Sequence, residues 1–200
     1  MTAAEDLAAA ARSLFARGYS FGTAGNLSVR DGDTIYVSPT NSSFEDLTAQ
    51  TLAVVDRGGR RLGGPAPSKE VHFHLALYES RPDAMAVVHL HSTYATAVSC
   101  LPGAELPIYT PYFAMRIPCL PVVPYYAPGA PELGPAVRAA AILSPAMLLK
   151  NHGSITAGRT VREATALAEE LEEQAKLYFL LGERGERLTA EQIAYLRGTP

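Results

Sequence analysis

Apolar residues recur at helical spacing near both ends of the chain. Leu7, Ala11 and Leu14 fall on one face of a helix over residues 4–17, and Gly18 suits the position after its last turn. The same spacing predicts a long helix over residues 160–181, with Leu167, Leu171 and Leu177 among its apolar positions. Thr189 and Gln192 form a capping box that predicts the start of a terminal helix.

Short runs that favour strands follow the first helix. They are Leu27–Arg30 and Thr34–Ser38, separated by Asp-Gly-Asp, and Leu52–Asp56, which precedes Arg-Gly-Gly-Arg. Turns this short join antiparallel neighbours, so these runs predict an antiparallel start to a sheet.

Helical and strand patterns then alternate through the middle of the chain. Pro67 and Ser68 predict a helix through about Tyr78 with Ser68 as its N-cap, and Ser92 is a candidate N-cap for a later helix. Proline prevents long regular elements between Leu106 and Pro131. The remaining predicted elements are a strand near Leu120–Tyr125, a helix to about Ala141, and strands at Ala86–His91, Met147–Lys150 and Ser154–Ala157. We therefore expect a single α/β domain over residues 1–200, with a central, mainly antiparallel sheet flanked by helices.

Composition narrows the class of ligand. The 200 residues carry a net charge of −3, without the basic excess of a nucleic-acid-binding protein, so a small ligand is favoured. No stretch has the length of a membrane span, and we expect no secretory signal. Cys100 and Cys119 form no CxxC pair and lie in apolar surroundings, which indicates buried, reduced thiols in a cytoplasmic protein.

The sequence contains five histidines, and three of them could bind one metal ion. Side chains alternate along a strand, so His89 and His91 share one face of Ala86–His91. His152 lies in an Asn-His-Gly turn between two apolar runs and is the best third ligand. Zn²⁺ accepts three neutral imidazoles and leaves a fourth position for a carboxylate, water or substrate.

Glu70 is the nearest attractive carboxylate. We expect it in the first turn of the helix that begins at Pro67 and Ser68, facing a cleft. The alternative is an ordinary partner of the helix dipole, which is the commoner role of a glutamate in a first turn. His72 and His74 follow on the same helix, and we expect structural or surface roles for both rather than metal binding.

Three polar segments could bind a phosphate group. The loop Gly22–Asn26 offers backbone N–H groups, although a tight turn into the next strand explains it equally well. Hydroxyl groups, backbone donors and one ammonium group come from Thr40, Asn41, Ser68 and Lys69.

Five motifs spread over nearly the whole chain carry a resemblance to a known family. They are Gly22-Thr-Ala-Gly-Asn-Leu-Ser-Val-Arg30, Ser38-Pro-Thr40, Pro67-Ser-Lys-Glu70, His89-Leu-His91 and Asn151-His152-Gly153. In this order they resemble the class II aldolase/adducin family. The resemblance implies that His89, His91 and His152 bind one divalent metal ion, usually Zn²⁺ with Mn²⁺ as an alternative. It implies that Glu70 is both a metal ligand and the acid/base group.

The resemblance extends to substrate binding and reaction type. It implies phosphate binding by Gly25, Asn26, Thr40, Asn41, Ser68 and Lys69. Within the family, the motifs around residues 67–78, 88–93, 110–112, 123–126 and 169–173 are most similar to the enzymes that decarboxylate 3-oxo-tetronate 4-phosphate. The implied reaction yields dihydroxyacetone phosphate and CO₂ through a metal-stabilised enediolate. A sugar-phosphate aldolase or epimerase is the alternative, because an aldolase forms the same intermediate.

Two departures and two further candidates complete the sequence-based interpretation. Asn41 stands where the aldolase pattern commonly has Gly, and Asn tolerates the left-handed backbone region. Lys69 stands where sugar-phosphate aldolases often have Ser, which argues against simple aldol cleavage. Tyr112 and Arg116 are candidates for a proton donor and an anion contact, or for packing and surface roles.

The family resemblance also implies a homo-tetramer. Adducin-like members of the family keep the fold as protein-interaction modules, which would have no need of three histidines and a glutamate at the metal positions. The presence of these residues therefore favours an enzyme.

Overall fold

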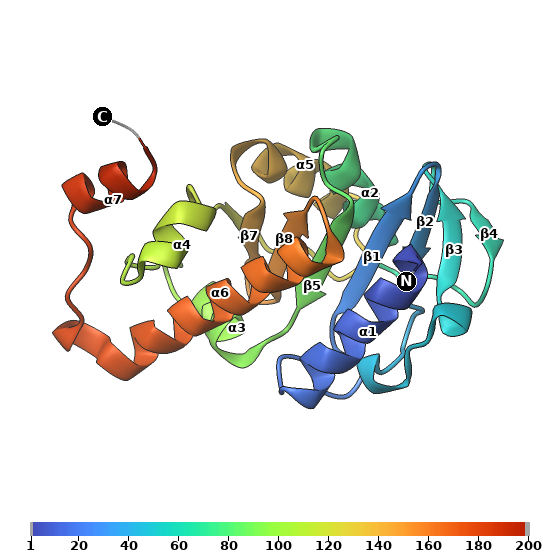
Figure 1. Ribbon diagram of the computed structural model, residues 1–200, viewed down its shortest axis with the longest axis horizontal. Coiled ribbons are helices and arrows are strands. Elements are labelled where there is room, and N and C mark those ends of the chain that lie inside the picture. The colour runs from blue at the N-terminus through green and yellow to red at the C-terminus, as the bar shows by residue number, and fades with distance from the viewer. Residues whose placement is uncertain (1, 199–200) are drawn as a thin grey trace.

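One eight-stranded sheet forms the centre of the computed structural model, which describes residues 2–198 (Figure 1). The strand order is β4-β3-β2-β1-β5-β8-β7-β6, and all neighbours pair antiparallel except the parallel pair β6 and β7. The strands are β1 (Asn26–Asp31), β2 (Thr34–Val37), β3 (Ala53–Asp56), β4 (Arg61–Gly63), β5 (Ala86–Leu90), β6 (Val122–Val123), β7 (Ala146–Leu149) and β8 (Gly153–Gly158). The predicted α/β fold with a mainly antiparallel sheet is confirmed.

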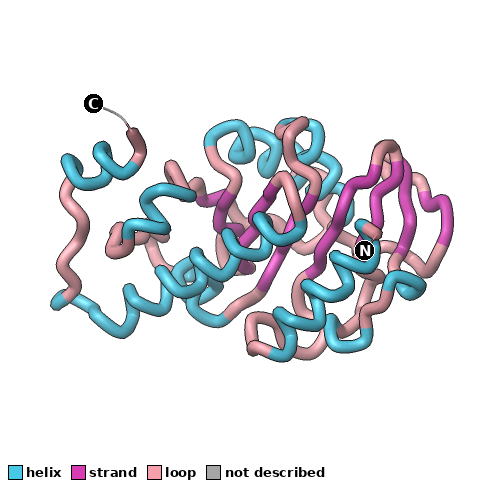
Figure 2. The backbone as a smooth tube through the Cα atoms, in the orientation of Figure 1, coloured by secondary structure: helices cyan, strands magenta, loops and turns pink. Residues whose placement is uncertain are grey.

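Helices cover both faces of this sheet (Figure 2). The described helices are α1 (Ala3–Ala16), α2 (Val71–Ser80), α3 (Thr93–Cys100), α4 (Pro111–Arg116), α5 (Leu133–Leu143), α6 (Val161–Leu181) and α7 (Ala190–Leu196). Single turns of 3₁₀ helix occur at Phe44–Asp46, Ala49–Thr51 and Gly182–Arg184. Helices α2 and α5 pack together in the layer behind the sheet, and α1 and α6 cross its front in Figure 1.

Burial along the strands follows their place in the sheet. The central strands β5, β7 and β8 are buried at every position because helices cover both of their faces. By contrast, β2 and β3 nearer one edge alternate between buried and half-buried positions. Fully buried Leu27, Val88 and Leu90 pack beneath α1 and α6, and each such side chain stabilises the fold by about 1.5–3 kcal/mol. The middle of the sheet is therefore a rigid support for whatever extends from the ends of β5 and β8.

Several predicted elements are present with shifted boundaries. The helix over residues 160–181 appears as α6, and the capping box of Thr189 and Gln192 opens α7. The strand expected at Leu120–Tyr125 shrinks to Val122–Val123. Helix α4 was not predicted, although Pro111 at its first turn and the Thr110 N-cap fit a helix start.

The helix predicted from Pro67 and Ser68 begins later, at Val71. Pro67 instead bridges Pro39, and Ser68 accepts hydrogen bonds from the Glu70 and Val71 N–H groups in a turn that precedes the helix. The prediction that Ser68 is the N-cap and that Glu70 lies in the first turn was therefore wrong, because Glu70 is itself the N-cap residue.

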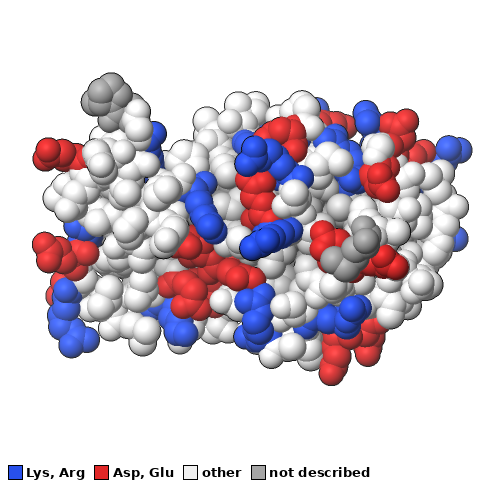
Figure 3. Space-filling model, in the orientation of Figure 1, with Lys and Arg blue, Asp and Glu red and all other residues white. Residues whose placement is uncertain are grey.

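The prediction of buried cysteines was also wrong. Cys100 and Cys119 are both exposed, since each lies at or beyond the end of a short helix and not inside it. Figure 3 shows basic and acidic side chains interspersed on one face of the molecule, with wide uncharged areas between them. Among the described residues, no helix combines the length and the apolar character needed to cross a bilayer.

Candidate functional site

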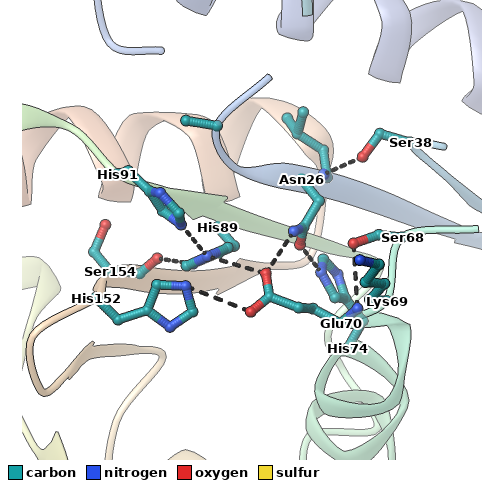
Figure 4. Close-up of polar contacts among 12 residues, drawn as sticks. Asn26, Ser38, Ser68, Lys69, Glu70, His74, His89, His91, His152 and Ser154 are labelled. Carbon is teal, nitrogen blue, oxygen red and sulfur yellow. Dashed lines mark hydrogen bonds and ion pairs between the residues drawn. The ribbon is translucent and has the colours of Figure 1, made fainter. Parts of the chain in front are cut away.

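Four side chains from distant parts of the chain converge where β5 and β8 meet. Glu70, His89, His91 and His152, here called the histidine cluster, each offer one ligand atom, and these atoms lie within 4.8 Å of one another. Figure 4 shows the three imidazoles and the carboxylate pointing toward one another from the end of β5, the β7–β8 turn and the start of α2. Sequence reasoning named the same four residues, and the fold brings them together.

Two local features of the backbone produce this convergence. Asn151 adopts a left-handed conformation with φ of 56°, which turns the chain tightly between β7 and β8 and leaves His152 at the end of the sheet. Gly153 then passes so close to β5 that a Cβ atom would lie 2.3 Å from the Leu90 carbonyl oxygen. Any larger residue would separate the two strands that carry the imidazoles.

Glu70 lies between two of the histidines. Its Oε2 is 3.4 Å from His89 Nε2, and its Oε1 is 3.4 Å from His152 Nε2. The residue is 7% exposed, and Asn26 Nδ2 donates a hydrogen bond of 2.9 Å to Oε2. Among the described residues, nothing donates a hydrogen bond to Oε1, although that oxygen is buried. A buried carboxylate oxygen without a donor is the atom a cation would bind.

Burial keeps the three imidazoles in the form that binds metals. It lowers the pKa of His89 well below its usual value, lowers the pKa of His91 to about 4, and also lowers the pKa of His152. His89 Nδ1 lies 2.8 Å from the Ser154 carbonyl oxygen, which can only accept, so Nδ1 carries the hydrogen. Neutral His89 therefore directs the lone pair of Nε2 into the cluster, as a metal ligand must.

The geometry of the cluster fits a divalent cation. Two ligands held about 2.0–2.1 Å from one tetrahedral ion lie about 3.3 Å apart, close to both Glu70–histidine distances of 3.4 Å. His89 Nε2 and His91 Nε2 are 2.9 Å apart, so both ring nitrogens face the same point. Three imidazoles and one carboxylate form a donor set suited to Zn²⁺ and other borderline divalent ions.

The other two histidines lie outside the cluster. His74 is fully buried, and its Nε2 is 2.5 Å from Asn26 Oδ1 while its Nδ1 is 2.8 Å from Ser28 Oγ. His72 is half-buried, with Nδ1 3.1 Å from the Lys69 carbonyl oxygen. Sequence reasoning gave His74 no named partner, because Ser28 and Asn26 lie on β1 and only the tertiary fold brings them beside α2.

The three polar segments expected to bind phosphate lie side by side. Thr40 N donates to the Ala66 carbonyl oxygen at 3.1 Å, and Ser68 N donates to the Ser38 carbonyl oxygen at 3.1 Å. Leu27 N donates to Ser38 Oγ at 3.1 Å, which ties the start of β1 to the same loop. We call residues 22–26, 38–41 and 66–69 the donor loops. Asn26 connects the donor loops to the histidine cluster through its hydrogen bond to Glu70.

The expected phosphate-binding residues in these loops differ in exposure. Asn26 and Ser68 are buried, Gly25 and Thr40 are half-buried, and Asn41 and Lys69 are exposed. Asn41 has φ of 57°, which confirms the expected left-handed conformation. Gly25 has φ of 82°, and a Cβ atom there would lie 2.6 Å from the His89 carbonyl oxygen, so its small size serves packing against β5.

Tyr112 and Arg116 lie away from the histidine cluster within one chain. Both are exposed on α4, with the Arg116 guanidinium 5.8 Å from the centre of the Tyr112 ring. Arg116 lines a cavity of about 500 Å³ with Arg81 and Gly158, at the end of β5 and β8 that lies opposite the cluster. The fold therefore does not bring these two candidates into the site of the same chain.

The chain is similar to known proteins over most of its length. Residues 5–179 match the model of the family described as "Class II Aldolase and Adducin N-terminal domain". The chain is 45% identical over 193 residues to a 3-oxo-tetronate 4-phosphate decarboxylase of Haemophilus influenzae, covering 94% of this chain and 89% of that protein. It is 36% identical to an L-fuculose phosphate aldolase of Methanococcus maripaludis, covering 85% and 92% of the two chains.

A solved structure is similarly close. The crystal structure of YgbL from Escherichia coli, described as a putative aldolase/epimerase/decarboxylase, superposes with a TM-score of 0.93 at 44% identity. The match covers 97% of each chain. The similarity therefore extends over the sheet, both helical layers and the segments that carry the histidine cluster.

Proposed function

Because this chain belongs to the class II aldolase and adducin family, we propose that it decarboxylates 3-oxo-tetronate 4-phosphate to dihydroxyacetone phosphate and CO₂. One observation carries the proposal: Glu70 and three neutral imidazoles converge beside the donor loops in a chain that is 45% identical to a decarboxylase of this name. A carboxylate, a set of possible metal ligands and candidate phosphate donors in one site support this reaction.

His89, His91, His152 and Glu70 would hold one divalent cation, Zn²⁺ or an ion such as Mn²⁺. When bound, the cation supplies Lewis-acid chemistry that stabilises the negative charge left on the substrate as CO₂ departs. The imidazole nitrogens need no deprotonation before they bind it, because burial already keeps these rings neutral.

Glu70 is the acid/base group in this proposal. Departure of CO₂ leaves an electron pair at C2 of the substrate, and a proton must reach that carbon to form the hydroxymethyl group of the product. In this proposal Glu70 takes up a proton from solvent while substrate is bound and passes it to C2, which returns its carboxylate to the unprotonated form. Its buried position and its hydrogen bond from Asn26 hold the carboxylate at a fixed place for that transfer.

The donor loops would bind the phosphate and orient the substrate. Gly25, Asn26, Thr40, Asn41, Ser68 and Lys69 contribute backbone N–H groups, hydroxyl groups and one ammonium group. Lys69 is exposed and therefore free to reach either the phosphate or the carboxylate of an incoming substrate. The substrate carries both a phosphate and a carboxylate. A site with the Lys69 ammonium group, at a position where aldolases often have Ser, suits such a substrate.

We also propose that the 200 residues act as one domain in a cytoplasmic homo-tetramer. Exposed Tyr112, Met115, Ile142 and Leu143 supply apolar surface that neighbouring subunits could cover. In such an assembly Tyr112 and Arg116 would act in a neighbouring site, since within one chain they lie away from the histidine cluster.

The decisive experiment is to incubate metal-loaded protein with 3-oxo-tetronate 4-phosphate and to measure CO₂ and dihydroxyacetone phosphate together. We expect equal amounts of both products. The 36% identity to an L-fuculose phosphate aldolase supports one alternative, aldol cleavage of a sugar phosphate. An aldolase would release dihydroxyacetone phosphate and an aldehyde from fuculose 1-phosphate without CO₂, and that result would replace our proposal.

A further inference from the structure

A line of buried hydrogen bonds runs from Glu70 into the protein, on the side away from the imidazoles. Asn26 Nδ2 lies 2.9 Å from Glu70 Oε2, and Asn26 Oδ1 lies 2.5 Å from His74 Nε2. His74 Nδ1 lies 2.8 Å from Ser28 Oγ, which lies 2.8 Å from the Tyr78 hydroxyl group. Figure 4 shows Asn26 between the Glu70 carboxylate and the His74 ring. We call these five residues the glutamate chain.

The burial of this chain is unusual for so many polar groups. Asn26, Ser28, His74 and Tyr78 are between 0% and 5% exposed, and they lie between β1 and α2, where apolar contacts would stabilise the fold equally well. Burying a polar group costs free energy unless its hydrogen bonds are satisfied. The chain satisfies these groups one by one: one end is the Glu70 carboxylate, and at the other end the Tyr78 hydroxyl group also lies 3.5 Å from the Met85 carbonyl oxygen.

The direction of every hydrogen bond follows from Glu70. A carboxylate only accepts, so Asn26 must present its NH₂ group to Glu70 and its carbonyl oxygen to His74. That oxygen requires a donor, so His74 carries its hydrogen on Nε2 and accepts at Nδ1. Ser28 then donates to His74 Nδ1 and accepts from the Tyr78 hydroxyl group. Burial also lowers the pKa of His74 to about 3, which agrees with a neutral ring.

We propose that His74 is a positioning residue that acts on Glu70 through Asn26. Its Nε2–H group fixes the Asn26 amide in the one orientation that donates to the carboxylate. This inference rests on the proposed role of Glu70 as acid/base group and adds the residue that holds it in place.

The alternative orientation of the Asn26 amide explains why His74 is needed to position it. If the amide turned by half a revolution, its oxygen would face Glu70 Oε2, and two acceptors would repel each other at hydrogen-bond distance. The carboxylate would then move relative to His89 and His152, which lie 3.4 Å away. Loss of a hydrogen-bonded supporting residue beside a metal-ligand set typically lowers activity or metal affinity about 10- to 100-fold.

The test compares His74→Gln with His74→Phe. The Gln side-chain amide can place an N–H group near the position of the imidazole Nε2–H, whereas Phe keeps a flat ring and donates nothing. We expect kcat to fall about 10- to 100-fold in His74→Phe with a smaller change in KM, and to recover to within a few-fold of wild type in His74→Gln. Equal kcat in His74→Phe and wild type would overturn the proposal, as would a His74→Gln variant that is folded but no better than His74→Phe.

Thr156→Val is the matched control. It removes another fully buried hydrogen bond of the same sheet, from Thr156 Oγ1 to the Ala164 carbonyl oxygen, outside the glutamate chain. We expect it to lower stability and to leave kcat within a few-fold of wild type. If His74→Phe fails to fold, Tyr78→Phe breaks the outermost link with the loss of one hydroxyl group and should give a smaller decrease in kcat. An unchanged kcat in that variant would count against the chain.

Two readouts separate this inference from the proposed function. Exchange of carbon-bound hydrogen of dihydroxyacetone phosphate with D₂O, followed by NMR, reports proton transfer by Glu70 in a decarboxylase and an aldolase alike. If wild-type protein exchanges this hydrogen but releases no CO₂, the proposal of a decarboxylase is wrong. The role of His74 can then still be tested by comparing exchange rates of the variants. Wild-type protein that does neither would overturn both the function and the positioning role.

The second readout needs no activity. NMR of ¹⁵N-labelled histidine distinguishes the two neutral tautomers of His74 in the purified protein. We expect hydrogen on Nε2 and none on Nδ1 near neutral pH. The opposite tautomer would reverse the direction of the chain and overturn the proposal, whatever reaction the protein catalyses.

Discussion

The histidine cluster and the donor loops border the same site but hold their polar groups in different ways. Glu70 and His89 are buried, and their remaining atoms are fixed by Asn26 and by the Ser154 carbonyl oxygen. In the donor loops, Asn26 and Ser68 are also buried, but Asn41 and Lys69 are exposed. The difference indicates that the reacting groups are positioned before substrate arrives, whereas the exposed binding groups adjust to it. Substitutions in the cluster should therefore act on turnover, and substitutions in the loops on substrate binding.

The strongest disruption of the cluster should come from His152→Ala. The variant loses one of three neutral donors, so we expect bound metal to fall from about one ion per chain to a small fraction of that, with turnover near background. Elemental analysis of purified protein measures the change. His72→Ala is the control, since His72 lies outside the cluster and should leave metal content unchanged. Full metal content in His152→Ala would remove this residue from the ligand set.

Glu70→Gln should separate chemistry from metal binding. Gln keeps the shape of the side chain but cannot carry the proton, so we expect kcat to fall about 100- to 10,000-fold. Because the carboxylate also faces the imidazoles, the assay requires saturating metal and a measurement of occupancy in the same sample. A folded, metal-loaded variant with wild-type turnover would contradict the acid/base role.

Lys69→Ala tests the other side of the comparison. Removing an ammonium group that pairs with a substrate anion should raise KM about 10-fold while kcat and metal content change little. The exposed position makes a folding defect unexpected. Steady-state kinetics with the phosphorylated substrate gives both parameters. A loss confined to kcat would mean that Lys69 belongs with the reacting groups and would erase the contrast between cluster and loops.

The smallest effect concerns stability at low pH. His74 has a pKa of about 3 when folded but near 6.5 when unfolded, so the unfolded chain binds the extra proton below pH 6.5. Stability that depends on this residue is therefore fully present above pH 6.5 and is lost as pH falls toward 3. We expect the difference in free energy of unfolding between wild type and His74→Gln to shrink by up to about 1.4 kcal/mol per pH unit between pH 6.5 and 5. Urea unfolding at several pH values measures it, and parallel curves would contradict a buried, neutral His74.

Local patterns were sufficient to predict the layered fold and the three histidines of the cluster. For Glu70 the local pattern favoured an ordinary partner of the helix dipole, and its role as a ligand was implied by the family resemblance. His89 and His91 were recognisable because a strand alternates its side chains, and His152 because a polar turn interrupted two apolar runs. The N-cap of α2 was placed two residues early, at Ser68 and not at Glu70, since the turn at Ser68 resembles an N-cap in sequence. The adjacent Pro67 pairs with Pro39 in the loop after β2, and this contact holds the segment outside the helix.

Features that depend on distant partners could not be predicted. The glutamate chain needs Ser28 beside His74, and that contact exists only once β1 and α2 have packed. The start of α3 is another case: Ser92 is its N-cap residue but makes no side-chain cap. The Glu172 carboxylate of α6 instead accepts hydrogen bonds from the Tyr94 and Ala95 N–H groups at 2.9 and 2.7 Å. No local rule links positions so far apart.

The contact between Glu172 and the start of α3 bears on the order in which parts of the growing chain can reach their final structure. Helix α3 begins directly after the segment that carries His91, so its final position depends on a carboxylate that leaves the ribosome later than every residue of the histidine cluster. The pairing of β5 with β8 must also wait for residues that follow His152. A growing chain can complete its N-terminal strands early, but β5 cannot pair with β8, and α3 cannot gain its contact with Glu172, until these later segments have been translated.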